Sequence, residues 1–248
     1  MNNSGKREIR TAAIVLGLAA LIYVLRWQIF DHPDEMLRYL MDDVAFLLIQ
    51  AMIVWLVLDR VLRRMERESM MNKLNMVIGA FYSELGTTLM GAIAAFDAEF
   101  CDVRPYLLVR QDWTAERYAQ AKATLSGYDF SIELGCGDLP ALKALLVQHR
   151  GFLLSLLENQ NLLEHEKFTE LLWAVFHLTE ELAVRPDVTC LPPSDAAHIT
   201  LDTTRAYRFL ISEWLDYMRH LQTQYPHLFS FAVRTNPLDP DAQATVTG

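Results

Sequence analysis

Two long uncharged runs lie in the first quarter of the chain. Residues 11–25 hold no charged side chain, and residues 44–58 hold none either. At about 1.5 Å per residue each run covers about 22 Å, whereas the hydrocarbon core of a bilayer is about 30 Å thick. Each run therefore needs its flanks, and residues 11–30 and 39–62 supply the missing length. The pattern predicts a hairpin of two transmembrane helices over residues 11–62.

Each of the two uncharged runs also has a simpler interpretation than a membrane span. A basic segment followed by an apolar run is also the pattern of a cleaved signal peptide, but residues 26–30 offer no small-x-small cleavage site. The second run is short enough to be a buried helix of a soluble domain. The close spacing of the two runs favours the membrane hairpin over both alternatives.

Basic residues next to the spans indicate the orientation of the hairpin. Those in the N-terminal segment 1–10 are Lys6, Arg7 and Arg10, and those after the second span are Arg60, Arg63, Arg64 and Arg67. The connector is acidic, with Asp31, Asp34, Glu35, Asp42 and Asp43 against Arg26 and Arg38. By the positive-inside rule both termini lie in the cytoplasm, and the arginines at 60–67 face lipid headgroups. We therefore expect a multi-pass protein of the cell inner membrane.

Helical periodicity continues after the second span. No proline intervenes from residue 60 to about 100, and apolar residues recur every three or four positions from Leu74 to Phe96. Further amphipathic helices are predicted over residues 114–126, 138–158, 164–184 and from 194 or 200 to 225. The fold class is therefore all-α: a transmembrane hairpin followed by a cytoplasmic helical bundle at 63–234. Residues 235–248 are predicted to be a disordered polar tail.

The charges are unevenly distributed along the chain. It has 22 Lys and Arg against 31 Asp and Glu, a net charge of −9, and the whole excess of acid lies after residue 70. This argues against a broad phosphate-binding surface, so nucleic acid is not an expected partner. Three scattered cysteines provide neither a disulfide framework nor a C-x-x-C pair, and we expect them to be small buried side chains.

Two features predict self-association. Gln50 lies near the middle of the second uncharged run, and a lone amide in hydrocarbon gains from a hydrogen bond to a neighbouring helix. Gly79, Ser83 and Gly86 fall on one face of the long helix after that run, where a second helix can approach closely. The alternatives are an amide bonded within its own hairpin and a helix that breaks near residues 86–91.

The motifs of the common enzyme classes are missing. The sequence contains no G-x-x-x-x-G-K-[ST], G-x-G-x-x-G, G-x-S-x-G or H-E-x-x-H motif. We therefore predict no cofactor and no catalytic residue.

One set of carboxylates and imidazoles is a candidate metal site. The five candidate ligands are Glu170 and His177 on one predicted helix, and Glu213, Asp216 and His220 on the last long helix. Such helices resemble those of a ferritin-like metal cage, but the E-x-x-H pairs of that family are absent. The alternative is that they form solvent-exposed polar faces. A second polar group near the start of the last helix is expected to form local ion pairs: Asp195, His198, Asp202, Arg205 and Arg208.

These patterns together predict an integral membrane protein that acts as a non-enzymatic, homo-oligomeric interaction or scaffold module. Its expected partners are the lipid bilayer, further copies of itself and a cytoplasmic protein. Two alternatives stay open. One is a small oligomeric ion channel lined by the second span, with Gln50 in the lining. The other is a metal-binding enzyme or sensor in the helical bundle.

Overall fold

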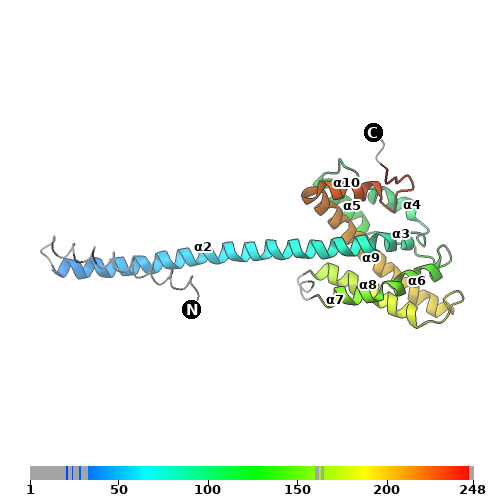
Figure 1. Ribbon diagram of the computed structural model, residues 1–248, viewed down its shortest axis with the longest axis horizontal. Helices are drawn as coiled ribbons and strands as arrows, with labels where there is room; N and C mark the ends of the chain where they lie inside the picture. The colour runs from blue at the N-terminus through cyan, green and yellow to red at the C-terminus, as the bar shows by residue number, and fades with distance from the viewer. Residues whose placement is uncertain are drawn as a thin grey trace. The chain divides into compact units, whose positions relative to one another are not determined.

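The computed structural model describes residues 33–159, 162 and 165–245, and residues 21, 24 and 28 before them. The elements within these residues are helices (Figure 1): α2 (Pro33–Phe81), α3 (Thr87–Ala94), α4 (Phe100–Val103), α5 (Ala115–Ser126), α6 (Leu139–Gln148), α7 (Arg150–Leu157), α8 (Glu166–Val184), α9 (Pro193–Gln224) and α10 (Pro226–Arg234). A π-helical turn, Tyr82–Gly86, joins α2 to α3, and a 3-10 turn, Arg104–Tyr106, follows α4. The predicted all-α class is confirmed for the described part of the chain.

The chain divides into two compact units, Met1–Glu66 and Arg67–Gly248. The second predicted span, residues 39–62, lies within α2 in the first unit. The first, residues 11–30, lies outside the described residues except at three positions. In the part that the structure describes, one helical stretch is long and apolar enough to cross a membrane, Lys73–Ala94, and 44% of its most apolar 18-residue window is buried. That stretch is a core helix of the second unit, so the structure supports the helices but not a hairpin of two membrane spans.

Helix α2 continues into α3 with a single wide turn between them. Pro33 starts α2, where its fixed φ suits the first helical turn, and the next proline is Pro105. In the π-helical turn, Thr87 Oγ1 donates to the Tyr82 carbonyl at 2.6 Å. The Tyr82 hydroxyl donates to the Leu210 carbonyl of α9 at 2.8 Å. The predicted long helix is therefore present, and the alternative break near residues 86–91 is not.

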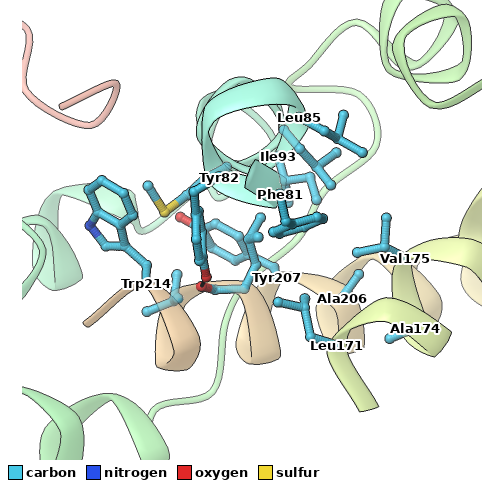
Figure 2. Packing of buried hydrophobic residues seen from close by; sticks show 14 of the residues in the cluster. Phe81, Tyr82, Leu85, Ile93, Leu171, Ala174, Val175, Ala206, Tyr207 and Trp214 are labelled. Atoms are coloured by element: carbon cyan, nitrogen blue, oxygen red, sulfur yellow. Dashed lines mark hydrogen bonds between the residues drawn. The ribbon is translucent and has the colours of Figure 1, made fainter. Parts of the chain in front are cut away.

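The core of the second unit forms where this long helix crosses α8 and α9. Figure 2 shows Phe81 and Tyr82 pointing toward side chains of the two other helices. Phe81 meets Phe168 of α8 edge-to-face, with ring centroids 5.5 Å apart, and Tyr82 stacks on Tyr217 of α9 at 5.0 Å. The aromatic rings at these crossings, of which Phe81, Tyr82 and Phe168 are fully buried, fix how the three helices pack, and thereby the register of α8 against α9.

Helices α8 and α9 are antiparallel neighbours. Only residues 185–192 connect them, and polar side chains of the two segments meet along the length of the pair. In order along the pair, these contacts are Arg185 with Asp195, His177 with Asp202, and His165 with Glu213. This register decides which of the predicted polar residues can meet.

Two expectations about the surface are wrong. Residues 235–248 are not a wholly disordered tail, because Asn236 and Leu238 are buried and Asn236 Nδ2 donates to the Leu107 carbonyl at 3.0 Å. Residues 246–248 lie outside the described residues. The three cysteines, expected to be buried, are Cys101, Cys136 and Cys190, and all three are exposed. Within residues 235–245, which the structure describes, the buried residues are Asn236 and Leu238.

Candidate functional site

Two imidazoles converge on one carboxylate where α8 and α9 face each other. His177 comes from the middle of α8, and His198 and Asp202 lie one turn apart in the first half of α9. Nε2 of His177 lies 3.1 Å from Oδ2 of Asp202, and Nε2 of His198 lies 3.3 Å from the same oxygen. One ligand atom from each residue lies within 4.8 Å of the other two. We call these three residues the histidine–aspartate cluster.

The aspartate of the cluster is buried, and its two histidines face solvent. Asp202 is 3% exposed, whereas the side chains of His177 and His198 are about half exposed, at 46% and 48%. Oδ1 of Asp202 accepts a hydrogen bond from Nη1 of Arg205 at 3.3 Å. Oδ2 makes no hydrogen bond within the described residues, although two imidazole nitrogens lie near it. Neither ring N–H is therefore aligned to donate to this oxygen.

Glu181 lies at the edge of the cluster, one turn after His177. Its Oε2 is 3.6 Å from Nε2 of His198, and its Oε1 is 3.9 Å from Nε2 of His177. The Arg185 guanidinium, 2.7 Å from Oε2, holds the pKa of Glu181 below its usual range through a hydrogen bond. Arg185 also binds both oxygens of Asp195, at 2.9 and 2.5 Å, and so ties the end of α8 to the start of α9.

Helical spacing explains why these residues meet. His177 and Glu181, and likewise His198 and Asp202, are four residues apart and share a helix face. Buried apolar residues alternate with them, namely Leu178 and Leu182 on α8 and Ile199 and Ala206 on α9. The polar pairs therefore lie at the edge of the apolar seam between two antiparallel helices.

Glu213, a predicted metal ligand, lies elsewhere in the core. It is 2% exposed, and its Oε2 is 4.0 Å from Nδ1 of His165, which precedes α8. Burial raises the pKa of Glu213 to about 7, and burial lowers the pKa of His165. The two groups are therefore a buried acid and a neutral imidazole rather than part of the cluster.

The remaining predicted ligands are also separate. Asp216 pairs with Lys122 of α5, and His220 packs edge-to-face on Tyr225, with ring centroids 5.7 Å apart. Glu170 lines an open groove of about 860 Å³, and His177 and Arg205 line the same groove. Of the five predicted ligands, His177 alone belongs to the cluster, because α8 and α9 run antiparallel and place it level with Asp202. The predicted five-residue metal site is therefore wrong as a set.

Comparison with known proteins identifies the family. The sequence profile described as "Uncharacterized protein MJ1433, C-terminal helical domain" matches residues 70–234, and that described as "MJ1433, N-terminal helical domain" matches residues 2–62. The chain belongs to the MJ1433 family. Uncharacterized protein MJ1433 of Methanocaldococcus jannaschii is 40% identical over 237 residues, which cover 96% of this chain and 95% of the relative. No solved structure matches the chain.

The residues predicted for the membrane and for self-association lie in both domains of this MJ1433 family member. Gln50, Arg60, Arg63 and Arg64 are exposed on α2, and Arg67 lies further along the same helix. Gly79 faces Tyr217 of the same chain, since a Cβ there would lie 3.5 Å from its hydroxyl. Gly86 is buried against Phe81 and Tyr82. The predicted interface at Gly79, Ser83 and Gly86 is therefore largely occupied by intramolecular packing, and Ser83 alone is exposed.

Proposed function

We propose that this chain is a membrane-anchored, non-catalytic interaction module whose C-terminal helical domain lies in the cytoplasm. One observation carries the proposal: α2 exposes apolar side chains on every face. Seven consecutive residues, from Met52 to Leu58, are each at least 50% exposed, and together they turn through nearly two helical turns. A helix that is apolar all round is stable when buried in protein or in lipid, not in water.

The length of this surface fits a bilayer. Residues 39–62 of α2 form about 36 Å of helix, against a hydrocarbon core of about 30 Å. Asp59 lies at its cytoplasmic end and accepts a hydrogen bond from Arg63 at 2.8 Å, so the charge at this edge is paired. Exposed arginines follow at positions 60, 63 and 64, where anionic headgroups would meet them. In our proposal residues 11–30 form the second arm of the anchor.

Gln50 supports self-association within the membrane. Its amide is exposed among apolar side chains of α2, and in lipid it gains most by bonding to another polar group. We expect crosslinking in native membranes to trap oligomers that are lost or reduced in Gln50→Leu. If the variant crosslinks as the wild type does, self-association through this amide is wrong. Conductance across liposomes that vanishes in Gln50→Leu would instead favour an ion channel.

Alkaline carbonate extraction of cell membranes tests the anchor. The full chain should stay in the pellet, and the double variant Ile53→Asp with Leu56→Asp should be released in part, because each Asp at the centre of a span costs about 3 kcal/mol. Leu201→Asp is the matched control, since Leu201 is a 65% exposed apolar residue of α9 outside the anchor. A wild-type chain found in the carbonate supernatant would overturn the proposal.

A further inference from the structure

We infer that His177, His198 and Asp202 bind a divalent transition-metal ion of the zinc type. The inference is independent of the membrane anchor, since the three residues lie in the C-terminal domain and none belongs to α2.

The distances between the ligand atoms fit a metal site. In a tetrahedral zinc site with bonds of about 2.0–2.1 Å to nitrogen and oxygen, neighbouring ligand atoms are about 3.3 Å apart. Oδ2 of Asp202 lies 3.1 Å from one imidazole Nε2 and 3.3 Å from the other. Two of the three distances between ligand atoms therefore match a shared ion, and the third, between the two imidazoles, is at most 4.8 Å.

The buried oxygen of Asp202 gives a second, independent reason. Asp202 is 3% exposed, and its Oδ2 has no hydrogen-bond partner in the described part of the chain. A buried carboxylate oxygen without a partner is costly, and a cation bound to it removes that cost. The other oxygen, Oδ1, accepts from Arg205 and is thereby oriented. A supporting hydrogen bond that orients a ligand is a regular feature of metal sites.

The ligand types indicate which metal the cluster selects. Two imidazoles and one carboxylate favour zinc and neighbouring transition metals, whereas Ca²⁺ and Mg²⁺ prefer oxygen ligands. An ion-pair network of protonated histidines fits less well, because neither ring N–H is aligned with the nearby oxygen of Asp202. Three protein ligands leave a fourth position on the ion. Glu181 lies 3.6 Å from Nε2 of His198 but is held by Arg185, so we assign the fourth position to water.

Metal titration of the full-length protein in detergent tests this inference. The protein carries a tag without histidines, is stripped with a chelator, and is titrated with Zn²⁺ by calorimetry and with Co²⁺ by visible absorption. We expect one ion per chain, a tetrahedral Co²⁺ spectrum, a zinc-dependent rise in Tm, and no binding of Mg²⁺ at the same concentrations. No bound Zn²⁺ at micromolar concentrations would overturn the inference.

Matched variants locate the site. His177→Gln and His198→Gln remove half-exposed ligands and should each weaken Zn²⁺ binding at least 100-fold. Arg205→Gln removes only the positioning contact to Asp202 and should weaken binding about 10-fold. His220→Gln is the control, because His220 lies on α9 away from the cluster and contacts Tyr225. Zn²⁺ affinity that survives the double variant of His177 and His198, or falls equally in His220→Gln, contradicts the site.

Discussion

Two buried carboxylates of α9 show how far neighbouring side chains set the chemistry of a residue. Asp202 has a guanidinium on one oxygen and two imidazoles near the other. Glu213, three turns later, has only His165 at 4.0 Å, and no cation touches it within the described residues. The surroundings of Asp202 favour the carboxylate and, in our inference, a bound metal ion. The surroundings of Glu213 favour its protonated form.

Glu213 makes stability depend on pH in a defined direction. Burial raises its pKa to about 7 from an ordinary value of 4.5, so the folded state holds a proton that the unfolded state has released. The contribution of this proton to the free energy of unfolding is fully present below about pH 4.5, and it is lost as the pH rises through about 7. We expect Glu213→Gln to be more stable than the wild type by about 3 kcal/mol at pH 8, and by only about 1 kcal/mol at pH 5.

Urea denaturation of both proteins at the two pH values measures this difference. The groups that face Glu213, namely His165, Asp216, Lys122 and Lys167, are present in both proteins, so their titration largely cancels. Glu170→Gln, the same substitution at an exposed position of α8, is the matched control. An equal effect of Glu213→Gln at pH 5 and pH 8 would show that folding does not raise the pKa of Glu213.

Among the elements, the π-helical turn between α2 and α3 depends on a glycine. A Cβ at position 86 would lie 2.6 Å from Phe81 and 2.8 Å from Tyr82, and both rings are buried. We expect Gly86→Ala to destabilise the domain by about 1–3 kcal/mol, because the rings cannot move aside without disturbing the core. Urea denaturation checks this, with Gly135→Ala as the control, since a Cβ there meets nothing within 4 Å. Equal stability of the two variants would contradict this account of the turn.

Periodicity predicts the elements well but not their pairing. The predicted helices at 114–126 and 164–184 correspond to α5 and α8 within two residues, while that at 138–158 is divided near His149 into α6 and α7. The last long helix begins at Pro193, before both predicted starts, so His198 lies inside it.

The histidine–aspartate cluster was predictable only in part, because periodicity does not show which helices pair. His177 was a candidate from the sequence, and His198 and Asp202 stood out as a polar group, but local ion pairs were expected of them. The available signal was two pairs spaced by four residues, His177 with Glu181 and His198 with Asp202, on consecutive helices. Their meeting depends on the register of α8 against α9, which aromatic contacts of the buried Phe168 and the partly buried Tyr217 set at long range.

The whole molecule combines an apolar segment with an acidic helical domain. Residues 2–62 and 70–234 match two separate domains of the MJ1433 family, and the chain divides into compact units at Glu66 and Arg67. In the proposed arrangement, repulsion between the acidic domain and an anionic leaflet keeps the domain in water, while lipid covers the exposed apolar residues of α2. The histidine–aspartate cluster then meets the ions of the cytoplasm.

The side of the membrane on which the C-terminus lies is the most direct test of this account. Green fluorescent protein and alkaline phosphatase are fused in turn after Gly248, and membrane-bound fluorescence and phosphatase activity are measured in the same bacterial host. The account predicts a fluorescent, membrane-bound fusion and an inactive phosphatase. An active phosphatase with a dark fluorescent fusion, or fluorescence in the soluble fraction, would contradict it.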